Sequence, residues 1–143
     1  GTKAELGERL VGRYAAKFEA ALSGIGAESL PAPQKLAAYV RLYSDVLRGE
    51  RICLCGMLAA EHATLPRAVQ DAIRRFFDAN EAWLAAVVEA GREEGTLRFE
   101  GDPRDVARLL LAALQGAMLV ARPFGEPERF EAATAALMAG LRA

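Results

Sequence analysis

The sequence lacks an excess of positive charge. Its 18 Lys and Arg residues are balanced by 19 Asp and Glu residues, so the formal net charge is −1. Basic and acidic residues are interleaved along the whole chain, and no basic patch stands out. Because a domain that binds nucleic acid by itself usually carries such a patch, we expect this chain not to bind DNA on its own.

Long apolar runs are missing as well. The longest, Leu109 to Leu114, is far shorter than the roughly 20 residues that span a bilayer, and the polar N-terminus is not typical of a signal peptide. The only two cysteines, Cys53 and Cys55, are poorly spaced to close a disulfide with each other on a helix. These features predict a protein of the reducing cytoplasm with no membrane partner.

The residue patterns of an enzyme are also absent. The chain has a single histidine, His62, whereas zinc and haem sites need more partners. The paired Glu-x-x-His motifs of a di-iron bundle do not occur, and we find neither a nucleophile–base pair nor a phosphate-binding loop. The sequence therefore predicts no catalytic residues, no metal ligands and no cofactor.

Strand-forming runs of Val, Ile and Thr are scarce, and Ala, Leu, Glu and Arg dominate the sequence. Glycine and proline divide the apolar periodicity into segments, and Thr2 with Glu5 has the spacing of a capping box at the start of the first. The predicted fold is all-α, one domain over residues 1–143 with six helices. We expect them at about 2–23, 33–48, 52–62, 66–94, 103–121 and 127–141.

The order of these helices resembles the C-terminal regulatory domain of TetR-family transcriptional regulators. Residues Thr2–Leu6 are similar to the segment that follows the family's recognition helix, and Cys53–Glu61 resembles the short buried helix of one large subgroup. Gly91–Leu97 is similar to the end of the family's long helix. Asp102-Pro103 followed by Leu111–Gly116 resembles its penultimate helix. The resemblance extends over nearly the whole chain.

This resemblance implies a ligand-sensing and dimerisation domain, by the family's habit part of a repressor. Residues 1–23 would connect to a DNA-binding head whose helix-turn-helix is missing, so DNA would be a partner only through that head. A small, largely apolar molecule would enter a pocket among the second to fifth helices and shift the first helix. The operator would then be released, because a ligand favours the state that it binds better. The alternative is a dimeric helical interaction module without a ligand.

Aromatic and polar side chains of the predicted helices are the candidate ligand contacts. Asn80 interrupts an apolar stripe, and a buried amide without a partner costs about 1–3 kcal/mol, so it should bond to another helix, to water or to a ligand. Tyr39 and Tyr43 lie one turn apart and would either offer hydroxyls to a ligand or pack in the core. Ligand pockets are mostly apolar with a few polar anchors. The predicted ligand-binding residues are Tyr39, Met57, Phe76, Asn80, Trp83 and Met118.

The two cysteines allow a further hypothesis, a redox or electrophile sensor. The predicted helix over 52–62 places Cys53 in its first turn, two residues from Arg51, and both features favour a thiolate. Some family members that resemble this subgroup use a cysteine near this position as such a sensor, so the resemblance points to Cys53. The competing interpretation is that both cysteines are small buried hydrophobic residues.

The last two predicted helices carry more apolar surface than one subunit can cover. The helix over 127–141 is apolar almost all round, and such a helix must be covered on more than one side. We therefore expect a homodimer in which both helices pair with their symmetry mates as a four-helix bundle. Gln115 would border either this interface or the pocket. The predicted interface residues are Leu114, Gly116, Phe130, Ala133, Leu137 and Gly140.

Overall fold

The computed structural model describes residues 2–49, 51 and 53–143. Its elements are α1 (Thr2–Ala27), α2 (Ala32–Arg48), α3 (Leu54–Ala59), the 3-10 helix η1 (His62–Thr64), α4 (Arg67–Glu94), α5 (Pro103–Phe124) and α6 (Pro127–Ala139). The described residues form no strand beyond one isolated bridge between Leu97 and Arg142. The prediction of an all-α fold is confirmed. The Thr2 side chain of the expected capping box, and Ile52 of the expected third helix, lie outside the described residues.

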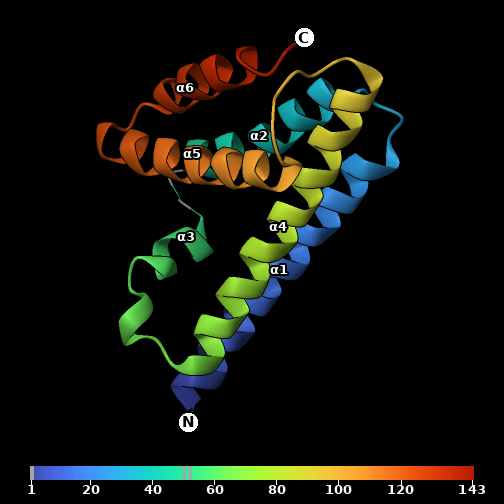
Figure 1. Cartoon of the computed structure of the whole chain (residues 1–143). Coiled ribbons are helices and arrows are strands. Elements are labelled where there is room, and N and C mark those ends of the chain that lie inside the picture. Colours follow the sequence, from blue (N-terminus) through green and yellow to red (C-terminus); the bar gives the residue numbers. More distant parts are fainter. Residues whose placement is uncertain (1, 50, 52) are drawn as a thin grey trace.

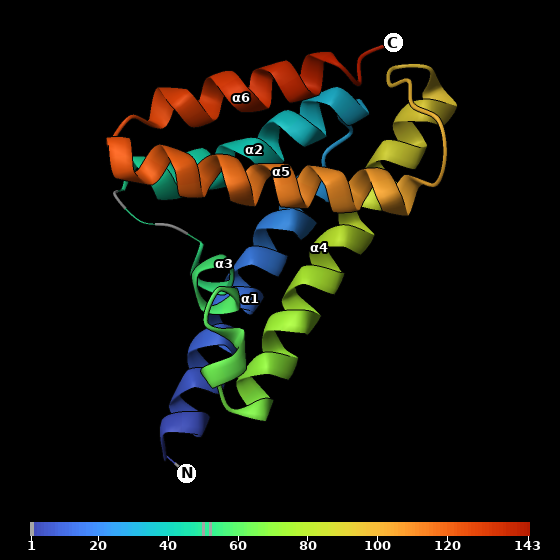
Figure 2. The same cartoon turned by 60° about the vertical axis from the view of Figure 1, so that its left-hand side comes forward.

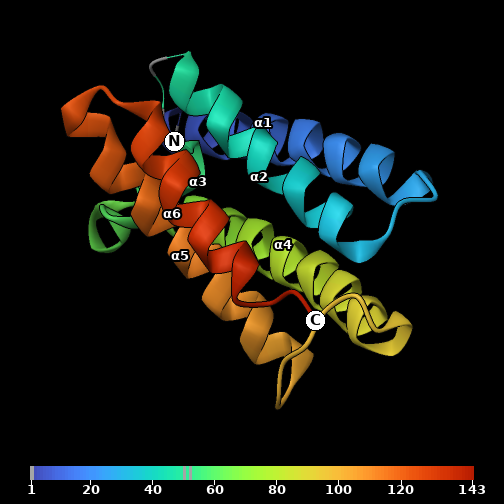
Figure 3. The ribbon, with the colours of Figure 1, turned by 90° about the horizontal axis from the view of Figure 1, so that it is seen from above.

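Two long helices form one limb of the molecule, and three helices form a layer across its end. Helices α1 and α4 run side by side in the same direction, starting from the end that carries the N-terminus (Figure 1). Helices α2, α5 and α6 stack across the opposite end, and α3 lies beside α1 (Figure 2). Seen from above, α6 lies between α2 and α5 (Figure 3). The N-terminus is therefore remote from the layer of α2, α5 and α6.

Glycine and aspartate set several helix limits as their chemistry predicts. Gly95 ends α4 and Gly125 ends α5, with φ angles of 78° and 63°. This left-handed conformation favours glycine because other residues are strained there. Asp102 caps α5 by accepting a hydrogen bond from the backbone N–H of Arg104 at 2.8 Å. Local sequence therefore ends α4 at Gly95 and begins α5 after Asp102.

Other helix limits differ from the prediction. Helix α1 continues through Gly24 and Gly26 to Ala27, because burial of Leu22 in its last turns outweighs the low helix propensity of glycine. Helix α5 likewise continues past residue 121 to Phe124. Helices α3 and α6 are shorter than predicted, at Leu54–Ala59 and Pro127–Ala139.

An aromatic cluster joins α1, α2 and α4 near the place where the two long helices meet the layer of α2, α5 and α6. The ring of Phe18 in α1 contacts Tyr39 and Tyr43 of α2 and Phe76 of α4, with centroid separations of 6.1, 5.5 and 5.4 Å. All four side chains are buried. Aromatic pairs of this kind contribute about 0.5–1.5 kcal/mol each beyond their buried area. The cluster fixes α1 against α2 and α4 beside the larger cavity described below.

Candidate ligand-binding site

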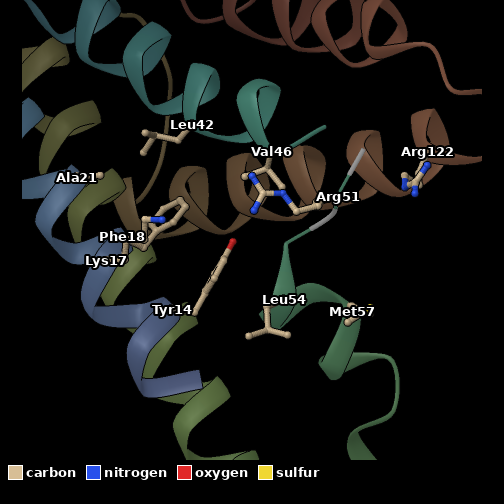
Figure 4. Close-up of a pocket in the computed structure, with 10 residues that line it drawn as sticks. All are labelled: Tyr14, Lys17, Phe18, Ala21, Leu42, Val46, Arg51, Leu54, Met57 and Arg122. Atoms are coloured by element: carbon tan, nitrogen blue, oxygen red, sulfur yellow. The ribbon is translucent and has the colours of Figure 1, made fainter. Parts of the chain in front are cut away.

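The larger described pocket opens between α1, α2, α3 and α5. Its volume is about 670 Å³, within the range of roughly 300–1,000 Å³ that is usual for small-molecule sites. Helix α1 forms one wall and α3 faces it from the other side (Figure 4). Most of the lining is apolar or aromatic, from Tyr14, Phe18, Ala21, Leu42, Val46, Leu54 and Met57.

Helical spacing explains why these side chains share one cavity. Tyr14 and Phe18 lie one turn apart on α1, and Leu42 and Val46 lie one turn apart on α2. Residues four apart lie on the same face of a helix. Each helix therefore presents a continuous apolar strip to the pocket, and half-buried Leu42 and Val46 adjoin the fully buried side of α2.

The rim of the pocket is positively charged. Its remaining lining residues are Lys17 of α1, Arg51 of the segment after α2, and Arg122 of α5. All three are exposed, and none forms an ion pair with a described residue. Among the described residues that line the pocket, there is no acidic side chain. The site thus combines an apolar interior with three cations at its edge.

Tyr14 supplies a polar atom inside this apolar wall. Its hydroxyl is buried and forms no hydrogen bond of good geometry with a described residue, although the Cys53 thiol and the Leu54 backbone lie beside it. Figure 4 shows the ring between Phe18 and Leu54, with the hydroxyl directed toward Val46 and Arg51. Burial, with a smaller contribution from the neighbouring Cys53 thiol, raises the pKa of Tyr14 well above its ordinary value. The group therefore stays protonated at neutral pH and can donate a hydrogen bond.

A chain of buried polar groups crosses the core behind the pocket. The Tyr39 hydroxyl donates to Oδ1 of Asn80 at 2.8 Å, and Nδ2 of Asn80 donates to the carbonyl of Phe76 at 2.8 Å. The hydroxyls of Tyr39 and Tyr43 lie 3.1 Å apart, and Nε2 of Gln115 donates to Tyr43 at 3.5 Å. Burial raises the pKa of both tyrosines. The chain joins α4, α2 and α5, and the buried amide predicted at position 80 has its partners within the protein.

The structure brings few of the predicted ligand-binding residues to the larger pocket. Of the six, only Met57 lines it. Phe76 and Asn80 border a smaller groove of about 240 Å³ between α1 and α4. Tyr39, Trp83 and Met118 line neither cavity. The larger pocket therefore lies against α1, whereas the prediction placed a pocket beside α4.

The remaining predicted contacts are core residues with specific partners. The Trp83 ring stacks on Tyr39, with centroids 5.5 Å apart and planes 21° apart. The Met118 sulfur accepts a hydrogen bond from the backbone N–H of Cys53 at 3.3 Å. Sequence reasoning missed Tyr14, Lys17, Phe18, Ala21, Leu42, Val46, Arg51, Leu54 and Arg122. The only sequence feature that pointed to any of these residues is the spacing of apolar residues one turn apart on α1 and α2.

Gln115 belongs to α5, and its side chain reaches α3 of the same protomer. Besides its bond to Tyr43, its side chain approaches Gly56 so closely that a Cβ at that position would collide with it. A side chain at position 56 would displace the flexible end of Gln115. Gln115 itself lines neither cavity, so its place at the pocket edge or at a subunit interface stays a prediction.

Both cysteines are buried next to this region. Cys53 is the N-cap residue of α3 instead of lying in its first turn. Its side chain is 1% exposed and that of Cys55 is 0% exposed. Burial, helped by the adjacent Cys53 thiol, raises the pKa of Cys55 to about 12. This environment supports the interpretation of small buried hydrophobic residues, and a sensing role of Cys53 stays a hypothesis.

The outer face of α5 and α6 is apolar and uncovered in the protomer. Leu109 and Val120 of α5 are 59% and 60% exposed, and Leu119 and Phe124 are also exposed. Helix α5 is long and apolar enough to cross a membrane by length and composition alone, a property that core helices of soluble proteins share. On α6 the matching residues are small: Ala132, Ala133, Ala136, Ala139 and Gly140 are exposed. We call these residues together with Gly116 the α5–α6 face.

The predicted interface residues divide between this face and the core. Gly116, Ala133 and Gly140 are exposed and belong to the α5–α6 face. Leu114 and Phe130 have no exposed surface in the protomer, so they belong to its core and not to a surface that a partner can contact. Leu137 is half-buried against the same core. The predicted set therefore contains residues of both the inner and the outer sides of α5 and α6, and the interface itself stays a prediction.

The fold and the site together define an all-helical domain with a pocket of small-molecule size and an unpaired apolar helix face. A family model described as the tetracyclin repressor-like C-terminal domain matches residues 32–137. The chain belongs to this family, and so to the C-terminal domains of TetR-family regulators. No curated protein matches the chain significantly.

Solved structures agree with this assignment. A TetR-family transcriptional regulator from Agrobacterium tumefaciens is 30% identical, with a TM-score of 0.94 over 99% of this chain and 75% of that chain. The reduced form of E. coli NemR is 25% identical, with a TM-score of 0.83 over 96% of this chain and 73% of that one. A regulatory protein TetR from Rhodobacter sphaeroides is 23% identical, with a TM-score of 0.88 over 97% and 76%, and supports the fold.

Proposed function

We propose that this chain is the effector-sensing and dimerisation domain of a cytoplasmic TetR-family repressor, and that it acts by binding and not by catalysis. One observation carries the proposal: an apolar pocket of about 670 Å³ has α1 as one of its walls. Four of its lining residues, Tyr14, Lys17, Phe18 and Ala21, belong to that helix. A molecule in the pocket therefore touches the element that extends to the N-terminal end of the limb.

The position of α1 suggests how binding is transmitted. Its N-terminal end lies far from the layer of α2, α5 and α6 (Figure 2), and we propose that it connects to the DNA-binding head in the longer protein. Phe18 both lines the pocket and packs on Tyr39, Tyr43 and Phe76. A ligand that fits one placement of α1 better than another shifts the population toward it. Moving that equilibrium from 1:99 to 99:1 requires roughly 10⁴-fold preference.

The second half of the proposal concerns the α5–α6 face. Isolated exposed apolar side chains are normal, but a continuous apolar face on two adjacent helices usually marks an interface. We propose that a second copy of the chain covers it, forming a four-helix bundle about a two-fold axis. The small residues of α6 support this packing because they allow helices to approach closely.

A thermal-shift screen tests the sensing proposal. Small molecules that bind the folded chain raise its melting temperature. Replacement of Ala21 by Trp fills the pocket, whereas Ala90→Trp places the same side chain at an exposed site on α4 that lines neither cavity. We expect active compounds to stabilise the unmodified chain and Ala90→Trp but not Ala21→Trp. Equal stabilisation of all three proteins would contradict the assigned site.

A further inference from the structure

We infer that the natural ligand of the larger pocket is an amphipathic anion, a molecule with an apolar body and one acidic group. The inference rests on the proposed function and names the chemical class of its effector. Two features carry it: the apolar interior, and the three rim cations, which form no ion pair with a described residue.

The interior accepts an apolar body. Side chains from α1, α2 and α3 surround it, and the charged lining residues are Lys17, Arg51 and Arg122. Transfer of apolar surface from water contributes about 25 cal/mol per Å². This part of the site therefore supplies most of the affinity without selecting a charge.

The rim selects the charge. Lys17, Arg51 and Arg122 come from three separate parts of the chain and line the same pocket, with Lys17 and Arg122 toward its opposite ends (Figure 4). Some arginines elsewhere pair with acidic residues, as Arg48 does with Glu131 and Arg104 does with Glu81 at 3.3 Å, whereas others, such as Arg41, form no ion pair with a described residue. The chain as a whole has 18 basic and 19 acidic residues, whereas the described pocket lining has three basic residues and no acidic one. The pocket is therefore locally positive.

Arg51 is held in place beside the pocket. Its backbone N–H donates to the carbonyl of Val46 at 3.1 Å, which ties it to the end of α2. The Tyr14 hydroxyl points toward these two residues (Figure 4). That hydroxyl itself is buried and not exposed to the pocket. An acidic oxygen at the rim therefore interacts with the exposed Arg51 guanidinium and not with Tyr14.

The acidic group stays at the rim. All three cations are exposed, so an anion beside them keeps part of its water and avoids the large penalty of full burial. Charge pairs in such a setting contribute modestly and weaken with salt. The arrangement therefore fits a single acidic group on an apolar molecule better than a compact, strongly hydrated anion such as free phosphate.

Two fluorescent probes with the same ring system test the inference directly. 1-Anilinonaphthalene-8-sulfonate carries one anionic group, and N-phenyl-1-naphthylamine is its uncharged counterpart. Titrating the chain with each at neutral pH, we expect the sulfonate to bind about tenfold more tightly. We also expect only the sulfonate's affinity to fall as salt increases, because salt screens exposed charges.

Single substitutions identify the residues that produce the preference for the sulfonate. Lys17→Gln, Arg51→Gln and Arg122→Gln should each weaken the sulfonate about twofold to threefold and leave the amine unchanged. Arg41→Gln is the matched control, since Arg41 is exposed on α2 and lines neither cavity. These substitutions are at exposed positions, so the chain should remain folded, which circular dichroism verifies.

The outcomes separate the inference from the proposed function. Equal affinity for both probes, unaffected by the three Gln variants but lost in Ala21→Trp, would overturn the anionic ligand and leave a sensor of neutral apolar molecules. Binding of both probes that persists in Ala21→Trp would place them outside the pocket and contradict the proposed function as well. Preference for the sulfonate that is lost in the Gln variants and retained in Arg41→Gln supports the inference.

Discussion

The hydroxyl of Tyr39 donates a hydrogen bond to Oδ1 of Asn80 at 2.8 Å and so links α2 to α4 within the core. Both side chains are almost completely buried. The amide nitrogen of Asn80 is also engaged, by the carbonyl of Phe76. Asn80 is thus a structural amide, because both its oxygen and its nitrogen have a partner within the protein.

Removal of the Tyr39 hydroxyl should destabilise the fold. Tyr39→Phe leaves Oδ1 of Asn80 buried without that donor, and a loss of about 1–3 kcal/mol in the free energy of unfolding follows. Tyr14→Phe is the matched control, because the Tyr14 hydroxyl forms no hydrogen bond of good geometry with a described residue. It should leave stability unchanged or raise it slightly. Urea unfolding of both variants measures the difference, and equal losses would contradict this description of the core.

Stability should depend on Glu94 in mildly acidic solution. Its carboxylate accepts hydrogen bonds from the Thr96 hydroxyl at 2.6 Å and the Ala32 backbone N–H at 2.8 Å. These bonds lower the pKa of Glu94 below its ordinary value of 4.5. A depressed pKa in the folded state gives stability above the ordinary pKa that is lost as the pH falls through the folded value.

The test of this dependence compares melting temperatures of the unmodified chain and Glu94→Gln between pH 7 and pH 3. The unmodified chain should be the more stable at neutral pH, and the difference should shrink as Glu94 becomes protonated. Glu93→Gln is the control, since Glu93 makes no described side-chain hydrogen bond or ion pair. A constant difference at every pH would show that the carboxylate charge is not involved.

The cysteines should react slowly in the folded protein. With a pKa of about 12 for Cys55, only about one thiol in 10⁵ is ionised at pH 7, and burial limits access to both. Iodoacetamide labelling of Cys53→Ser and Cys55→Ser, followed by mass spectrometry, gives the two rates. We expect Cys55 to be the slower, and both to react rapidly in urea. Fast labelling of Cys53 in the native chain would instead favour the electrophile-sensor hypothesis.

The chain should sediment as a homodimer at twice its mass of 15.3 kDa. Val120→Glu places a charge on the α5–α6 face where the side chain is 60% exposed, so it should give a folded monomer. Leu137→Glu should also destabilise the protomer and give aggregation or an unstable monomer, because Leu137 packs against the core. Ala90→Glu, on an exposed part of α4, is the control and should remain dimeric. A stable monomer for the unmodified chain at micromolar concentration would refute the dimer.

The sequence predicts the helices well because periodicity reports which residues face inward. The burial of Asn80 followed from its place on an apolar stripe, but its partner Tyr39 lies 41 residues away and was not evident. The same limit applies to Leu114 and Phe130, since an apolar residue can face its own core or a second subunit. Periodicity alone does not distinguish these two environments.

The pocket was the least predictable feature. Tyr14, Leu54 and Arg122 meet only because α1, α3 and α5 pack around one space. No local pattern in any of these helices predicts the pocket. The most conspicuous aromatic residues, including Trp83, pack against other side chains and do not line it. Only the chain's long-range contacts determine which apolar strips remain uncovered.

The central claim is that a small molecule binds between α1, α2 and α3. Hydrogen exchange of the chain, measured by mass spectrometry with and without saturating 1-anilinonaphthalene-8-sulfonate, tests it most directly. We expect slower exchange in residues 14–21, 42–47 and 54–58, with little change in α6. Protection confined to the α5–α6 face, with the exchange of α1 unaltered, would contradict it.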